Sequence, residues 1–366
     1  MNTMTLLALA GGLTVAAQAA SAETIRATSG FGPAHPIAVH EYPETNLRLQ
    51  EFTDGRWELQ DTPAGLVAPN EMSAALRDGV TEYGALLMPY FPAGFPDAAL
   101  PAELSILGRD NFVVSSAVTE YIVTCAPCQQ EFQRNGQVYL GSDTTPVYNF
   151  LTIEPIRTAA DLQGKRIRTG APLFAGFVAS LGAEAAQIPS SELFETLSQG
   201  VITGTLSGTH EVIAQRLGDV IGYVTEIEMG FFNSAATATA SRILWDRMTP
   251  EDRAALARAA QYGVSKGLFG FNADAAAARE VEGIEFIPAD ATLVQARDAY
   301  VADHLSRVAQ ILTDRGVADA QAKIDRYTAL IAKWEGLVPE NVTHEQLAEL
   351  RNTEIFSRID FATYGQ

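Results

Sequence analysis

The spacing of Cys125 and Cys128 most directly suggests chemistry in this chain. A Cys-x-x-Cys pair serves as a redox couple in thioredoxin-like proteins, where it lies next to a β-α-β unit. Here the surrounding sequence is helix-like, and nothing else typical of that fold is present. In an oxidising compartment two such cysteines form a structural disulfide. We therefore expect a disulfide between Cys125 and Cys128, with redox catalysis as the alternative.

Other patterns of catalysis and metal binding are missing from the sequence. His210-Glu211 lacks the second histidine that a helical zinc protease carries four residues after the first, because Ala214 stands there. No Gly-x-Ser-x-Gly elbow, phosphate-binding loop or dinucleotide fingerprint occurs. The five histidines are scattered without the spacing of metal ligands. We expect no enzymatic activity, no cofactor and no metal site.

The charge of the chain limits its partners. Lys and Arg total 25 and Asp and Glu total 44, which gives a formal net charge of −19. A protein this acidic is a poor ligand for nucleic acid, since phosphate binding needs clustered basic residues. It is equally unsuited to direct binding of anionic lipid. An acid bound by this chain must therefore be held by a specific local cation.

The first 22 residues predict an export signal. An apolar, uncharged stretch over residues 6–17 leads to Ala20-Ser21-Ala22, a small-x-small triplet that predicts cleavage before Glu23. No Lys or Arg precedes the apolar stretch, which departs from the usual signal. No later run approaches the ~20 apolar residues that span a bilayer. We expect an exported, periplasmic protein.

Short β-like runs alternate with helical patterns along the rest of the chain, as is typical of α/β proteins with mainly parallel strands. Helices are expected from about Pro36, over 70–77, from Ser190 or Ser191 to Gln199, and from Thr249-Pro250 to about 269–278. From Thr292 onward the pattern predicts almost continuous amphipathic helix. No linker separates two halves, which favours lobes that exchange segments. Strands are expected over 24–28, 56–60, 83–88, 137–141, 166–169 and 234–241.

Four spaced elements in the middle of the chain carry a resemblance to a known family. They occur in order as Asp161-Leu162-Gln163-Gly164-Lys165-Arg166-Ile167-Arg168, Leu181-Gly182-Ala183, Pro189-Ser190-Ser191-Glu192-Leu193-Phe194 and Gln199-Gly200-Val201-Ile202-Thr203-Gly204. The sequence resembles the DctP-like substrate-binding proteins of tripartite ATP-independent periplasmic (TRAP) transporters. More diffuse similarity extends over most of the chain after residue 22. The family's usual Asp in the last element is replaced by Thr203.

The resemblance implies an α/β, two-lobed periplasmic-binding-protein fold with segment-swapped lobes joined by hinge strands and long helices. We expect residues 23–147 plus about 232–272 in the first lobe, and 148–231 plus about 273–366, with the C-terminal helices, in the second. The implied function is a periplasmic receptor that binds a small organic acid between the lobes and delivers it to membrane subunits of the Q and M type. We expect a monomer. The alternatives are a receptor for another transporter or sensor, and a periplasmic enzyme that uses Cys125 and Cys128.

Arg168 matches the family's arginine that pairs with the substrate carboxylate. This role suits a guanidinium, whose planar fork of donors fits a carboxylate. Further ligand contacts are expected where loops follow strands on the side of the cleft. Tyr148 stands where many relatives have a second basic or polar contact. This difference, together with Thr203 in place of the usual Asp, favours a monocarboxylate, or an acid with an apolar body, as the ligand. The other expected contact residues are Phe31, His35, Tyr90, Phe91, Asn149, Ser207, Thr209 and Phe231, with Phe232 as the alternative to Phe231.

Overall fold

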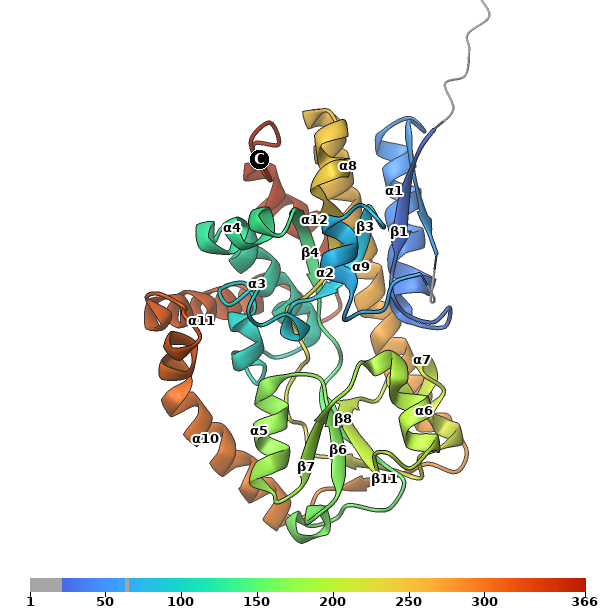
Figure 1. Cartoon of the computed structure of the whole chain (residues 1–366), viewed down its shortest axis with the longest axis vertical. Coiled ribbons are helices and arrows are strands. Elements are labelled where there is room, and N and C mark those ends of the chain that lie inside the picture. The colour runs from blue at the N-terminus through green and yellow to red at the C-terminus, as the bar shows by residue number, and fades with distance from the viewer. Residues whose placement is uncertain (1–21, 63–65) are drawn as a thin grey trace, which may run out of the picture.

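The computed structural model describes residues 22–62 and 66–366. Figure 1 shows two lobes, one above the other, each with a β-sheet and covering helices. Two separate mixed sheets linked by crossing segments agree with the two-lobed α/β fold expected from the sequence. All but the last residue of the expected export signal lie outside the described residues. In the described part of the chain, no helix is both long and apolar enough to cross a membrane.

The first lobe is built on a five-stranded sheet in the order β2-β1-β3-β10-β4. Strands β1, β2 and β3 are parallel, whereas β10 runs antiparallel to both of its neighbours. The expected strands of this sheet are confirmed to within three residues at each end. They are β1 (Glu23–Thr28), β2 (Trp57–Asp61), β3 (Tyr83–Leu87), β4 (Gln137–Asp143) and β10 (Ala235–Ser241).

The second lobe is built on a six-stranded sheet in the order β11-β9-β5-β8-β6-β7. Here β5 is the antiparallel strand, and it pairs with β8 and β9. The strands are β5 (Tyr148–Thr152), β6 (Arg166–Thr169), β7 (Glu184–Gln187), β8 (Gly204–Gly208), β9 (Tyr223–Glu226) and β11 (Glu285–Pro288).

Two short segments carry the chain between the sheets. Residues 144–147 lead from β4 to β5, and residues 227–234 return from β9 to β10. The segments are bonded to each other: Val147 and Phe231 form an antiparallel bridge, and the Tyr148 N–H donates to the Gly230 carbonyl at 2.7 Å. Each sheet thus receives its antiparallel strand directly from the other lobe, which is the exchange of segments that the sequence predicts. We call residues 144–147 and 227–234 the hinge segments.

The helices cover the faces of both sheets. In the first lobe α1 and α3 lie beside the sheet, while α5, α6 and α7 lie around the second sheet (Figure 1). The helix expected from about Pro36 begins as a π-helical turn over Ile37–Glu41. The α-helices are α1 (Tyr42–Phe52), α2 (Met72–Arg77), α3 (Asn111–Val123), α4 (Ala126–Arg134), α5 (Pro172–Ser180), α6 (Leu193–Ser198), α7 (Glu211–Ala214), α8 (Arg242–Arg247), α9 (Pro250–Ala277), α10 (Ala291–Asp314), α11 (Ala320–Leu337) and α12 (His344–Glu354).

Helix α9 extends from the first lobe to the second. Its start is set locally, since the Thr249 hydroxyl accepts from the Asp252 N–H and Pro250 takes the first helical position. In its middle, Gly263 lets the helix approach α1, because a Cβ there would lie only 1.9 Å from the Thr45 hydroxyl. Farther along, Phe271 borders the space between the lobes.

The C-terminal part of the chain contains three helices, so the almost continuous helix expected from Thr292 is interrupted at two places. The chain turns at Gly316, whose φ of +90° favours glycine, and again around Pro339. Helix α10 contacts the second lobe, where the Tyr300 hydroxyl donates to the Leu173 carbonyl at 2.9 Å. Helices α11 and α12 instead pack on α3 and α9 of the first lobe, although we expected them to accompany the second.

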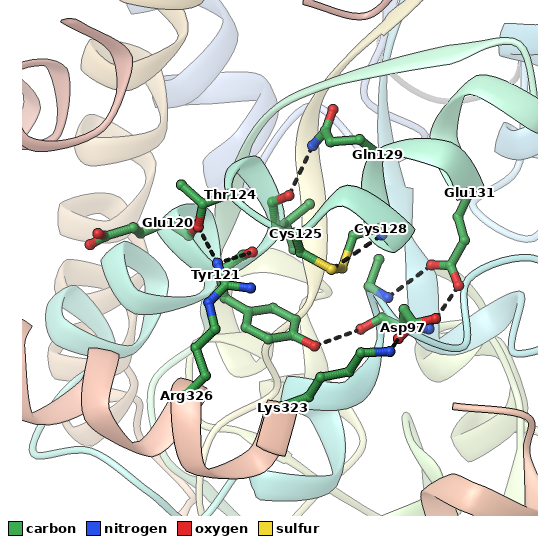
Figure 2. Close-up of a disulfide and its surroundings, with 12 residues drawn as sticks. Asp97, Glu120, Tyr121, Thr124, Cys125, Cys128, Gln129, Glu131, Lys323 and Arg326 are labelled. Carbon is green, nitrogen blue, oxygen red and sulfur yellow. Dashed lines mark hydrogen bonds and ion pairs between the residues drawn. A yellow bond between two sulfur atoms is a disulfide. The ribbon is translucent and has the colours of Figure 1, made fainter. Parts of the chain in front are cut away.

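Cys125 and Cys128 form the expected disulfide at the start of α4 (Figure 2). Both residues are buried beneath helices of the first lobe. Cys125 also caps α4, since its Sγ accepts from the Cys128 N–H at 3.1 Å. The bond therefore closes a tight turn between α3 and α4, as a structural staple would.

Candidate functional site

A cavity lies between the lobes, and both contribute to its wall. The wall combines aromatic rings with a few polar groups, the usual composition of a small-molecule site. Its lining residues are Phe31, His35, Ile37, Leu87, Tyr90, Asp143, Thr144, Thr145, Tyr148, Arg168, Ser190, His210, Glu211, Phe232, Ala235, Thr237 and Phe271.

Arg168 supplies the positive charge of this cavity. It lies on β6 between β7 and β8, and only 1% of its surface is exposed. Its Nε donates to the Ile188 carbonyl at 2.7 Å, and its Nη2 donates to the Tyr90 hydroxyl at 3.0 Å. Its Nη1 is buried and has no hydrogen-bond partner in the described part of the chain. The protein thus fixes the guanidinium in place and leaves one amino group for a partner of another kind.

The surroundings keep Arg168 charged. Burial alone would lower the pKa of Arg168, but the oxygens of Tyr90, Tyr148 and Glu211 raise it above its usual value. Within residues 22–62 and 66–366, no carboxylate lies within 4.0 Å of this guanidinium. A buried cation without a counter-ion is costly. The site therefore favours an anion.

A cluster of aromatic rings includes Tyr90, whose hydroxyl accepts from the guanidinium. The Tyr148 ring stacks on Phe174 with centroids 4.6 Å apart, and it lies nearly parallel to Phe232 at 6.2 Å. Tyr90 meets Phe232 edge-on at 6.5 Å. Gly170 permits this close packing, since a Cβ there would lie 3.3 Å from the Phe232 ring. This end of the cavity can hold the apolar body of a small acid.

Two histidines and two phenylalanines form another part of the wall. Phe31 stacks on His35 at 3.9 Å, and Phe271 meets the edges of His35 and His210 at 5.4 and 4.8 Å. Burial lowers the pKa of His210 to about 3. Burial, with His210 adding to it, also lowers the pKa of His35 well below its usual value. Both rings are neutral at neutral pH and act as aromatic surfaces rather than as further cations.

Glu211, at the start of α7, is the carboxyl group whose charge raises the pKa of Arg168. It is buried, and its Oε2 has no hydrogen-bond partner. Burial raises the pKa of Glu211 to about 7, although the charge of Arg168 opposes the rise. A carboxyl and a guanidinium therefore face one cavity without forming a direct ion pair.

A second acidic group borders the cavity at the end of β4. Asp143 lies beside Glu41, because a Cβ on Gly267 would lie 3.1 Å from Asp143 Oδ2 and 3.4 Å from Glu41 Oε2. Burial raises the pKa of Asp143 to about 7, while Arg351 opposes the rise. Burial and the charge of Asp143 raise the pKa of Glu41 well above its usual value. The two carboxyls hold at least one proton near neutral pH, since like charges this close resist joint ionisation.

Half of the ten expected contact residues line the cavity. They are Phe31, His35, Tyr90, Tyr148 and Arg168.

The other five do not line it. Asn149 is used in the hinge, where its Oδ1 accepts from the N–H groups of Ile227 and Glu228 at 2.9 and 3.1 Å. The remaining four are Ser207 and Thr209, buried at the end of β8, and Phe91 and Phe231, which border other hollows of the surface.

Several cavity residues escaped the sequence reasoning. Asp143 follows the rule used for the other contacts, since it ends a strand, but nothing in its local sequence marks it. Of the two phenylalanines that the sequence left open, Phe232 faces the cavity, because Phe231 is the residue that pairs with Val147 in the hinge. His210, Glu211 and Phe271 reach the site only through the packing of α7 and α9. The described part of the chain places no three His, Cys, Asp or Glu side chains together as metal ligands.

Comparison with known proteins gives one family and many similar folds. Residues 42–280 match the model of the bacterial extracellular solute-binding proteins, family 7. A solute-binding protein of Roseobacter denitrificans is 29% identical over 161 residues, which cover 42% of this chain and 49% of that protein. The chain therefore matches about half the length of this curated relative.

Solved structures extend the similarity to nearly whole chains. A TRAP periplasmic solute-binding protein from Bordetella bronchiseptica, with bound (R)- and (S)-mandelate, has a TM-score of 0.74 and 22% identity, and the match covers 85% of this chain and 99% of that one. A TRAP solute-binding protein from Rhodoferax ferrireducens, in complex with copurified benzoate, has a TM-score of 0.73 and 21% identity, over 86% and 99%. At these identities the likeness establishes the fold.

Proposed function

Because the chain belongs to the bacterial extracellular solute-binding proteins, family 7, whose members are receptors rather than enzymes, we propose that it is the periplasmic receptor of a TRAP transporter. The proposed ligand is a small monocarboxylic acid with an apolar or aromatic body. The ligand carboxylate pairs with Arg168. The rest of the ligand lies against the aromatic rings of the cavity.

One observation carries this proposal: the buried Nη1 of Arg168 has no partner in a cavity between two lobes. Its Nε and Nη2 already donate to Ile188 and Tyr90, so its orientation is fixed before a ligand arrives. A guanidinium held in this way offers a charge-assisted hydrogen bond, which is about twice as strong as a neutral one.

The shape of the wall supports an aromatic or apolar ligand body. Tyr148, Phe232 and Tyr90 line the cavity together with Arg168, and the neutral rings of His35 and His210 extend the aromatic surface. No second arginine or lysine lines the cavity among the described residues, which favours one carboxylate over two. The relatives that hold mandelate and benzoate are consistent with such a ligand.

We propose that binding closes the two lobes about the hinge segments, as in other hinged receptors. The first lobe then comprises the five-stranded sheet with α1–α4, the first part of α9, α11 and α12. The second comprises the six-stranded sheet with α5–α7 and α10. The closed receptor delivers its ligand to membrane subunits of the Q and M type.

A ligand panel tests the proposed function. Thermal unfolding of the chain from Glu23 is measured with benzoate, mandelate, phenylacetate and succinate, and with benzamide as the uncharged match for benzoate. A ligand at a thousand times its dissociation constant should raise the free energy of unfolding by about 4 kcal/mol. Stabilisation by an aromatic monocarboxylate but not by benzamide supports the proposal. Equal shifts with the acid and its amide would refute it.

Delivery is tested separately. Uptake of the labelled acid is measured in membrane vesicles that contain the Q and M subunits. Uptake should require the receptor, and uptake that is unchanged without the receptor would refute this step.

A further inference from the structure

Glu211 and Arg168 have complementary unpartnered atoms in the same cavity. Nη1 of Arg168 and Oε2 of Glu211 are both buried, and both lack a hydrogen-bond partner among the described residues. Both residues line the cavity, yet the described part of the chain has no ion pair between them. The space between them can hold a ligand that meets both.

The protein itself does not satisfy the Glu211 carboxyl. Its Oε1 lies 3.8 Å from Nε2 of His210, a ring that burial keeps neutral. Ser207 and Gln215 are its other polar neighbours, and both lower its pKa. However, among the described residues neither Ser207 Oγ nor Gln215 Nε2 has a hydrogen-bond partner within 3.5 Å, so neither makes a close hydrogen bond to Glu211. A buried carboxyl left in this state is costly unless something else pairs with it.

We propose that Glu211 is a specificity residue that accepts a hydrogen bond from a hydroxyl next to the ligand carboxylate, so that the receptor prefers 2-hydroxy monocarboxylic acids to the same acids without the hydroxyl. This inference rests on the proposed function, because Arg168 must hold the carboxylate for Glu211 to meet its neighbour. A hydroxyl suits the site better than an ammonium group. An ammonium has three N–H donors to satisfy, whereas the nearby wall is largely aromatic.

Loss of the hydroxyl leaves the Glu211 oxygen buried and unpaired in the complex. Hydrogen bonds to charged or ionisable groups typically contribute enough to change affinity by about 10- to 100-fold. We therefore expect mandelate to bind about 10- to 100-fold more tightly than phenylacetate, and lactate more tightly than propionate by a similar factor.

Calorimetric titration of these matched pairs tests the inference. In Glu211→Met the preference for the hydroxy acid should fall to threefold or less, mainly because the hydroxy acid binds more weakly. Glu211→Gln keeps an amide oxygen at the same place and should keep part of the preference. Glu195→Met removes an exposed acid from α6 and should leave the preference unchanged.

The outcomes separate this inference from the proposed function. Equal binding of mandelate and phenylacetate to the natural chain, or an unchanged preference in Glu211→Met, would overturn the role of Glu211 while leaving the acid receptor intact. Tighter binding of phenylglycine than of mandelate would overturn the choice of a hydroxyl over an ammonium. Failure of all these acids to bind, including benzoate, would overturn both proposals together.

Discussion

Replacement of Arg168 by methionine separates ligand binding from folding. Methionine keeps the apolar stem out to about the position of Nε, but it removes the guanidinium that Ile188 and Tyr90 hold in place. The variant loses two internal hydrogen bonds of a charged group, each about 1.5–3 kcal/mol net. It also no longer buries a cation without a counter-ion, and this removes a penalty of several kcal/mol from the folded state. These effects oppose each other, so the ligand-free variant should still fold.

Binding should respond much more strongly. Removing one partner of a buried, hydrogen-bonded charge pair costs about 3–5 kcal/mol, because the ligand carboxylate is left desolvated and unpaired. At about 1.4 kcal/mol for each factor of ten, this is a loss of affinity between roughly a hundredfold and several thousandfold.

The matched control lies two residues away on the same strand. Arg166 is also on β6, but its side chain is 45% exposed and pairs with Glu184 at 3.1 Å. Arg166→Met removes the same charge from the protein and should change affinity less than threefold. Calorimetry gives the dissociation constants, and thermal unfolding without ligand verifies the fold. A loss of less than threefold in a folded Arg168→Met, or equal losses in both variants, would refute the assignment of the carboxylate site.

Three further predictions concern Tyr90, the carboxyl pair of Asp143 and Glu41, and the disulfide. Tyr90→Phe removes the hydroxyl that accepts from the guanidinium and should weaken acid binding about tenfold, as a loss of about 1.4 kcal/mol; an unchanged dissociation constant in calorimetry would count against this positioning role. Burial raises the pKa of Asp143 to about 7, with the pKa of Glu41 also raised, above the value of about 4 for unfolded carboxyls. The folded state therefore holds extra protons, and the contribution of these two groups to stability should be full below about pH 4 and fall as pH rises to about 7, by up to about 1.4 kcal/mol per pH unit for each group. Asp143→Asn should reduce this slope in urea unfolding, and an identical slope would contradict the prediction. Replacing Cys125 and Cys128 by serine should lower the free energy of unfolding by about 2 kcal/mol, since the loop they close is short. Ligand affinity should not change, and a loss of binding would argue against a purely structural disulfide.

The sequence by itself determined the local elements of this protein. The strand Arg166–Thr169 and the start of α9 at Thr249-Pro250 occur where the sequence predicts them. Strand patterns and helix caps depend on residues within a few positions of each other, so they can be recognised in the sequence alone. The spaced motifs around Arg168 likewise identified the family that residues 42–280 match.

Only the tertiary structure decided which side chains share the cavity. Phe232 rather than Phe231 faces it, because pairing across the hinge sets which face of the backbone each ring occupies. Glu211 and Phe271 line the same cavity as Arg168 and His35 because helices from different parts of the chain pack together there. Such contacts depend on the register of strands and the crossing of helices over more than a hundred residues, so no local pattern encodes them. For the same reason the packing of α11 on α3 was not evident from the amphipathic pattern, which predicts a buried face without naming its partner.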